Sequence, residues 1–201
     1  MSITNYSELL TAVANWINRG DLTDRIPEYI AFAEAKMNGR LRVRQMEAST
    51  TDTMSSSAIT LPSDWMAFKS IWYTKNGQRI EILNIPVQEA NRIDQGTTNP
   101  PRGYYITGST VSFFPTADSD YTVGYIYYQQ IPALTVSNTT NWLLTYAPDA
   151  YLYGTVLEAA AYIRDPKLQA DAERAFYSVL GRIKTADRDV HSGSALRMRT
   201  Y

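Results

Sequence analysis

The segment PDAYLYGTVLEAAAYI, residues 148–163, most constrains the fold because its helical pattern is apolar on nearly every side. Leu152, Val156, Ala159 and Ile163 fall on one face at helical spacing, and further apolar residues lie beside that face. An apolar surface this wide has to be covered by at least two neighbouring elements. We therefore predict that this helix lies at the centre of a helical core.

Helices from both ends of the chain are available to cover it. Asn5, followed three residues later by a glutamate, forms a capping pattern ahead of the helices predicted for about residues 5–45. Asp165 and Pro166 stop the apolar helix and begin another, so residues 147–186 are predicted to form a helical hairpin.

The middle of the chain, about residues 58–131, has the alternation and the turn residues of β-strands. Asn76-Gly77 and Gly108-Ser109 each predict a tight hairpin turn. The chain has 15 Tyr and only 5 Phe, and seven of the tyrosines fall in this middle region, where strands favour aromatic residues. The polar run before them, STTDTMSSSA (residues 49–58), is expected to be a loop or an irregular edge.

These elements predict an α+β fold: a helical bundle formed by the N- and C-terminal helices, with a small antiparallel β-sheet inserted between them. The pattern indicates neither a second hydrophobic core nor an internal repeat, so residues 1–186 are expected to be a single domain. Helical periodicity then stops, and residues 187–201 are expected to form an extended C-terminal tail.

The composition excludes several classes of protein. Cysteine is absent, which excludes a disulfide framework, thiolate metal ligands and a thiol nucleophile. A net charge of −1 supplies no global field that would attract nucleic acid or an anionic membrane. The first residues lack the pattern of a signal peptide, and no apolar run reaches the roughly 18 residues that a spanning helix needs. We expect a protein made in the cytoplasm, with no membrane partner.

Residues with the spacing of an active site or a metal site are sparse. The single histidine, His191, lies in the predicted tail, where nothing holds an imidazole rigidly enough for catalysis. Asp118 and Asp120 lack the glycine and the glutamate of a calcium loop, so they are interpreted as a solvated turn. Glu34 and Glu158 stand singly and are expected to be solvated or ion-paired. We therefore predict no enzymatic activity, no cofactor and no bound metal.

A group of arginines allows an interpretation in which part of the surface contacts nucleic acid. Arg40, Arg42 and Arg44 run together at the end of the second long predicted helix, and the C-terminal end of the chain is basic as well. Such a patch is able to neutralise phosphates. Cations near the C-terminus of a helix also interact favourably with the helix dipole, and the near-neutral balance of the chain favours that second interpretation.

Two short apolar segments lie outside the predicted core elements. Trp142, Leu143 and Leu144 form a run ahead of the core helix. The two leucines are expected to pack the sheet onto the helices. For Trp142 two interpretations stay open: the same packing role, or contact with another subunit. The closing residues SGSALRMRTY alternate apolar and basic side chains, which is the pattern of a strand that adds to another sheet or lies in a groove. A disordered tail explains the same composition, so both interpretations stay open.

Three segments carry a more specific pattern: IPEYIAFAEAKMNGRLR (residues 26–42), LPSDWMAFKSIWY (61–73) and IPALTVSNTTNWLLTYAPDAYLYGTVLEAAAYIRDP (131–166). Together they resemble the tailed-bacteriophage head-to-tail adaptors of the SU10 adaptor type. The combination of IPAL, NWLL and PDxYLYG in the third segment is the most specific part, and the terminal SGSALRMR also resembles the closing segment of these proteins.

The resemblance implies a structural protein of the virion, located at the head–tail junction, and not an enzyme. Adaptors of this type form a ring, expected to be a dodecamer, which docks below the portal protein and presents a platform for the tail nozzle or other tail proteins. The ring surrounds the DNA passage without specific recognition. The alternative is a tail-associated module that binds glycans or fibres, in which Tyr and Trp rings would stack on sugars. A cell-wall-degrading enzyme ranks last.

The resemblance also assigns candidate contact residues. The tail residues implied to face the portal are Leu196, Arg197, Met198 and Arg199. The candidates for contact between subunits are Trp142, Trp72 and Tyr128, because protein interfaces favour aromatic side chains.

Overall fold

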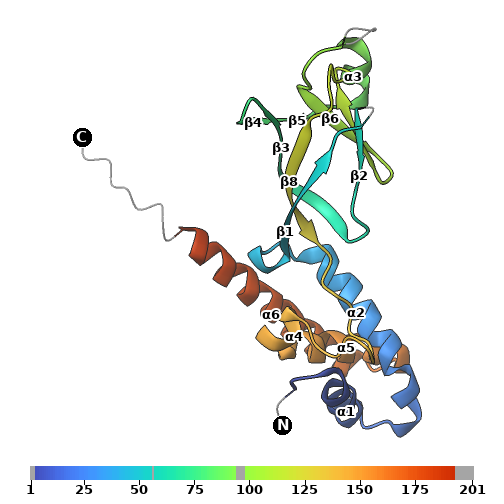
Figure 1. Cartoon of the computed structure of the whole chain (residues 1–201). Helices are drawn as coiled ribbons and strands as arrows, with labels where there is room; N and C mark the ends of the chain where they lie inside the picture. The colour runs from blue at the N-terminus through green and yellow to red at the C-terminus, as the bar shows by residue number, and fades with distance from the viewer. Residues whose placement is uncertain (1–2, 56, 94–97, 193–201) are drawn as a thin grey trace, which may run out of the picture. The chain divides into compact units, whose positions relative to one another are not determined.

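The computed structural model of the 201-residue chain describes residues 3–55, 57–93 and 98–192. The chain divides into two compact units: a helical unit made of residues 1–45 and 131–201, and a β unit made of residues 46–130. Figure 1 shows the helices of the first and the strands of the second. The combination of helices and two small sheets confirms the predicted α+β class.

The helical unit gathers helices from both ends of the chain, as the sequence predicts. Asn5 caps the first of them, because its side-chain oxygen accepts a hydrogen bond from the backbone N–H of Glu8 (3.0 Å). The elements are α1 (Tyr6–Ile17), the 3-10 helix η1 (Gly20–Arg25), α2 (Ile26–Arg40), the 3-10 turn η2 (Arg44–Met46, which ends at the boundary with the β unit), α4 (Trp142–Tyr146), α5 (Pro148–Ile163) and α6 (Pro166–Ser192).

Helix α5 is the central helix of this unit. It contacts α1, α2, α4 and α6, and residues on most of its sides are buried. Gly154 lies at a close contact of α5 with α2 and α6. A Cβ atom at this position would lie 2.9 Å from the ring of Phe176 in α6 and 3.2 Å from the Cβ of Ala33 in α2. The glycine therefore permits the close packing of α5 against both neighbours.

Helix α6 extends farther than the sequence pattern predicts. The pattern ends the helix near residue 186, whereas α6 continues to Ser192. One reason is a contact that local periodicity does not reveal: the backbone N–H of Arg44 donates a hydrogen bond to the carboxylate of Asp187 (3.0 Å). This bond holds the turn beyond residue 186 against the segment that follows α2.

The β unit contains two four-stranded sheets and one short helix. The first sheet has the strand order β1-β8-β3-β4 and is antiparallel throughout, and the second has the order β2-β7-β6-β5. The elements are β1 (Glu47–Thr53), β2 (Ala58–Thr60), β3 (Trp65–Lys75), β4 (Gln78–Glu81), β5 (Leu83–Asn84), α3 (Val87–Ile93), β6 (Gly103–Thr107), β7 (Thr110–Phe114) and β8 (Thr122–Gln129).

Both predicted hairpins are confirmed. Asn76 and Gly77 connect β3 to β4 with φ angles of 52° and 77°, and Gly108 begins the turn from β6 to β7 with a φ of 60°. Glycine and asparagine tolerate this left-handed backbone better than other residues, which is why these dipeptides predict the turns.

One prediction about the strands was wrong and another was only partly right. A single antiparallel sheet is predicted, but the unit has two sheets, and β5 pairs with β6 in parallel. The polar run from residue 49 is predicted to be a loop or an irregular edge; it forms most of β1, which lies at a sheet edge but pairs regularly with β8 through seven residues. Ser and Thr suit this place because β1 is an edge strand with largely exposed side chains.

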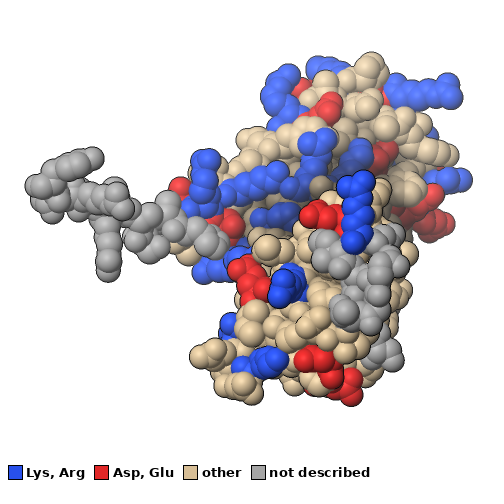
Figure 2. All heavy atoms as spheres, turned by 90° about the horizontal axis from the view of Figure 1, so that it is seen from above, with Lys and Arg blue, Asp and Glu red and all other residues tan. Residues whose placement is uncertain are grey.

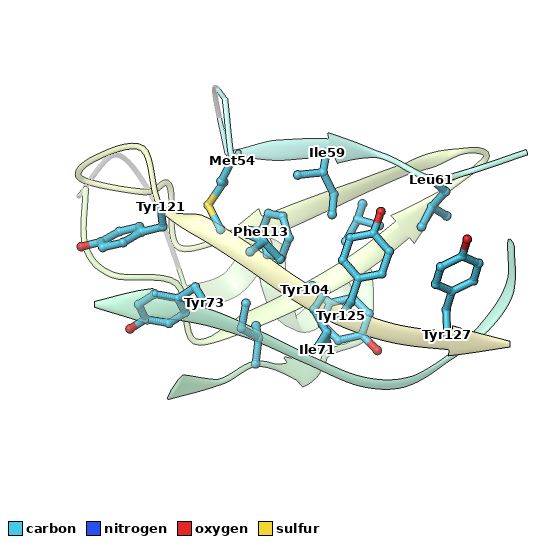
Figure 3. Packing of buried hydrophobic residues seen from close by; sticks show 13 residues of the cluster. Met54, Ile59, Leu61, Ile71, Tyr73, Tyr104, Phe113, Tyr121, Tyr125 and Tyr127 are labelled. Carbon is cyan, nitrogen blue, oxygen red and sulfur yellow. The ribbon is translucent and has the colours of Figure 1, made fainter. Parts of the chain in front are cut away.

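Residues from both sheets form the core of the β unit (Figure 3). Tyrosine rings supply much of it: Tyr73, Tyr104, Tyr121, Tyr125 and Tyr127 are all buried there. Burial raises the pKa of Tyr125 to about 12, and the negative charge of Asp52 adds to the rise. The abundance of tyrosine in the predicted strands is therefore explained largely by packing.

Candidate subunit interface

The segment of residues 131–141, which leads into α4, forms hydrogen bonds with α1 and α2 through its backbone N–H and C=O groups. This segment begins the most specific part of the sequence pattern, and its donors and acceptors bond to side chains of α2 and to the backbone of α1. The bonds are Ile131 N–H to Asn38 Oδ1 (2.8 Å), Leu134 N–H to Glu34 Oε1 (2.8 Å) and Tyr6 N–H to the carbonyl of Thr139 (2.8 Å).

A buried polar network lies beneath this segment. Asn141 Nδ2 donates to the carbonyl of Pro132 (2.7 Å) and to the hydroxyl oxygen of Tyr151 (2.6 Å). Tyr151 in turn donates its hydroxyl proton to Glu34 Oε1 (3.1 Å). Asn141 Oδ1 accepts from the N–H of Leu144 (2.8 Å) and so caps α4. The network joins α2, α4, α5 and the loop before α4.

The electrostatics of the network suit a structural role. Burial raises the pKa of Glu34, and the hydrogen bonds from Leu134 and Tyr151 oppose this rise. Burial raises the pKa of Tyr151 as well, with the Glu34 charge as a second cause, so the tyrosine stays a hydroxyl donor. Glu34 is 6% exposed and Tyr151 is 0% exposed, which leaves no access for a substrate.

Sequence reasoning missed the role of Glu34. It is expected to be solvated or ion-paired, whereas it is buried and hydrogen-bonded to neutral groups. The available signal was its place on α2, four residues after the buried Ile30 and three before the buried Met37. The same expectation for Glu158 is confirmed, because Lys36 forms an ion pair with it.

The apolar run ahead of the core helix divides into two parts. Leu143 and Leu144 are fully buried in the helical unit, where α4 packs on α5. Trp142, the first residue of α4, is only half-buried. The two leucines therefore belong to the helical core, and Trp142 is the residue of the run that meets solvent.

Trp72 and Tyr128 lie on one outward face of the first sheet. Their sequence neighbours Tyr73 and Tyr127 point into the core, and side chains alternate between the two faces of a strand. Both Trp72 and Tyr128 are half-buried. Two of the three predicted contact residues thus share a surface, whereas Trp142 belongs to the helical unit.

A shallow hollow of about 540 Å³ lies on this outward face. Small hydroxyl side chains of β1 leave the space open, and the larger side chains of β3, β4 and β8 surround it. The lining residues are Ser49, Thr50, Thr51, Trp72, Arg79 and Ile126. The lining therefore combines apolar and polar groups.

The Trp72 ring is held in place on both sides. A Cβ atom at Gly124 would lie 2.6 Å from the indole, so only glycine lets the ring lie across β8. The guanidinium of Arg79 lies over the ring, 4.7 Å from its centroid. The indole is therefore a preorganised part of the outward face.

The remaining predicted residues lie near or beyond the end of α6. Leu196, Arg197, Met198 and Arg199 are outside the described residues. His191 falls within the last turn of α6 and not in an extended segment. In the part of the chain that the structure describes, no group of His, Asp or Glu is arranged to hold a metal ion, and no helix is long and apolar enough to cross a membrane.

Comparison with models of protein families gives a match over nearly the whole chain. The model of the SU10 adaptor protein family matches residues 4–199, which include both units and the polar network. No curated protein matches the chain. Because the family model covers nearly the whole sequence, the chain belongs to the SU10 adaptor protein family, the structural adaptors that join the head of a bacteriophage to its tail.

Proposed function

We propose that the chain is a subunit of the phage head-to-tail connector and forms a ring that docks below the portal. In the virion this ring presents a platform for the tail nozzle or other tail proteins and surrounds the DNA passage without reading its sequence. The ring is proposed to be a dodecamer. The family match over residues 4–199 is the observation that carries the proposal.

The contact between neighbouring subunits is proposed to use the outward face of the first sheet. A closed ring with head-to-tail contacts needs two different patches on each subunit. The outward face with Trp72 and Tyr128 supplies one patch, and the half-buried Trp142 of the helical unit supplies a residue of the other. Aromatic anchors of this kind carry much of the binding energy in protein interfaces.

The portal contact is proposed to use Leu196, Arg197, Met198 and Arg199. Their alternation of apolar and basic side chains suits a segment that binds in an extended conformation to another protein. These residues follow α6, so the helix would connect the portal contact to the core of the helical unit.

A tail-associated module that binds glycans or fibres is the second candidate. Sugar binding needs an aromatic ring with an open face. The ring of Trp72 lies across Gly124 and beneath Arg79, which leaves it poorly placed for stacking on a sugar. This geometry argues against sugar stacking at Trp72.

The portal anchor is tested with a chain that ends at Ser192 and so retains all of α6. The truncated chain is expected to keep the circular dichroism spectrum and the unfolding midpoint of the full chain, and to lose co-sedimentation with the cognate portal assembly. The variants L196A/M198A and R197Q/R199Q separate the apolar contribution from the basic one. Unchanged co-sedimentation of the truncated chain would show that the anchor lies elsewhere.

A further inference from the structure

Five exposed cationic side chains gather where the segment after α2 meets the last turns of α6. Two contacts bring these parts together: the Arg40 guanidinium lies 4.5 Å from the ring centroid of Tyr177, and the Arg44 N–H bonds to Asp187 (3.0 Å). We call this set the basic cluster; it consists of Arg40, Arg42, Arg44, Lys184 and Arg188.

One side of α6 provides an open strip along the cluster. Tyr177, Gly181, Lys184 and Arg188 follow one another at intervals of four, three and four residues, which places them on one face of the helix. A Cβ atom at Gly181 would meet nothing within 4 Å. The space beside Gly181, one turn before Lys184, is therefore open.

The Lys and Arg side chains of the helical unit differ in whether they form ion pairs with carboxylates. None of the five forms an ion pair with a carboxylate in the part of the chain that the structure describes, whereas Lys36, Arg174 and Arg182 each do. Asp187 and Asp189 flank Arg188 in the sequence, and each of them has interactions of its own. Asp187 accepts a hydrogen bond from the backbone N–H of Arg44.

We propose that the basic cluster binds the phosphate backbone of duplex DNA. Spaced, exposed Lys and Arg side chains neutralise phosphates and contribute no base recognition, which fits a surface along which DNA slides. Figure 2 shows that Lys and Arg side chains are prominent on the face that it draws, with Asp and Glu among them. The interpretation of these cations as partners of the helix dipole fits Arg42, whose guanidinium donates to the carbonyls of Asn38 and Leu41 at the end of α2. It does not account for the contacts that bring Arg40 and Arg44 to α6.

The inference rests on the proposed function in one respect: it assigns this face of the helical unit to the DNA passage. Binding itself is measurable on the free chain. The probe is a short fluorescently labelled duplex of random sequence, titrated with the full-length protein at several salt concentrations and followed by anisotropy.

The variant R44Q/K184Q/R188Q removes three cations of the cluster and keeps Arg40, which packs on Tyr177. We expect its affinity for the duplex to fall about tenfold or more at low salt, and the slope of log affinity against log salt to decrease by about 3. The control R164Q/K167Q/R174Q removes two exposed arginines and one exposed lysine from the start of α6 and the turn before it. We expect this control to bind nearly as tightly as the unmodified chain.

Equal losses in the two variants, or no binding by the unmodified chain at low salt, would overturn the inference. Polyglutamate that competes as well as unlabelled duplex would assign the cluster to an acidic protein instead. Co-sedimentation with portal, measured on the same variants, separates the two proposals. A chain that binds DNA through the cluster but never binds portal would contradict only the proposed function.

Discussion

The hydroxyl of Tyr151 in α5 donates a hydrogen bond to the carboxylate of Glu34 in α2 over 3.1 Å, within the buried part of the helical unit. The two residues are 117 positions apart, and they belong to two of the segments that resemble the adaptor family. Part of the specific sequence pattern therefore serves to hold the loop before α4 on the helices.

Replacing Tyr151 with Phe removes the hydroxyl and keeps the ring. Asn141 Nδ2 then loses its acceptor at 2.6 Å, and Glu34 loses one donor. We expect the free energy of unfolding to fall by about 1–3 kcal/mol in denaturant titrations. The control is Tyr153→Phe, because the Tyr153 hydroxyl forms no hydrogen bond with the described residues; its effect should stay within about 0.5 kcal/mol. Equal effects would contradict a role for the network.

Replacing Glu34 with Ala leaves the N–H of Leu134 and the hydroxyl of Tyr151 without their acceptor. Each buried donor left unpaired costs about 1–3 kcal/mol, so the Ala variant should be strongly destabilised. The Gln variant retains an acceptor oxygen and, at pH 4, should unfold at nearly the same denaturant concentration as the unmodified chain. A Gln variant as unstable as the Ala variant would show that the negative charge is essential.

The pH dependence of stability tests the burial of the Glu34 charge. The pKa of Glu34 is higher in the folded state than its unfolded value of 4.5, so folding favours the neutral carboxyl. The stability that the neutral carboxyl contributes is fully present below pH 4.5 and is lost as the pH rises through the folded pKa. Glu34→Gln carries no charge at any pH. We expect the stability of the Gln variant relative to the unmodified chain to increase from pH 4 toward neutral pH. A constant difference across that range would argue against the raised pKa.

Substitution of alanine for glycine is expected to change stability in opposite directions at two positions in the helices. Gly154→Ala places a Cβ atom 2.9 Å from the Phe176 ring and should destabilise the helical unit by about 1–3 kcal/mol. Gly181→Ala meets nothing within 4 Å and should stabilise α6 by about 0.5–1 kcal/mol, because alanine favours helices. Thermal unfolding followed by circular dichroism measures both. Stabilisation by Gly154→Ala would mean that α5 and α6 are not closely packed at this point.

The proposed subunit contact is tested with two half-buried tyrosines of the β unit. Tyr128 lies on the outward face of the first sheet, and Tyr105 points away from the core on the second sheet, since its neighbours Tyr104 and Ile106 pack inward. Tyr128→Ala should weaken ring formation on portal by about 2 kcal/mol, the loss of an interface anchor. Tyr105→Ala should leave ring formation unchanged in mass photometry. The reverse result would move the contact to the second sheet.

Local features of the fold could be predicted because their causes lie within a few residues. The turn at Asn76-Gly77 follows from backbone preferences, and the cap at Asp165 follows from its short acceptor side chain; both are confirmed. The wide apolar surface of α5 likewise predicts its central position, since only burial on several sides accommodates it.

Features that depend on distant residues could not be predicted. Glu34 is buried because a loop 100 residues away supplies an N–H donor, and helical spacing does not reveal that partner. The composition of β1 is typical of a loop or an irregular edge. The segment forms a regular strand because it pairs with β8, which is distant in the sequence. Division of the strands into two sheets depends on the same long-range pairing. The outward positions of Trp72 and Tyr128 follow from alternation once the strands are known.

Ring formation is tested most directly by cryo-electron microscopy of the full chain mixed with its cognate portal assembly. We predict a closed, dodecameric ring of identical copies on the portal, with the outward face of the first sheet at the contact between neighbours. Portal particles that carry no ring, while the chain stays monomeric in the same mixture, would contradict the proposal that this protein is a connector subunit.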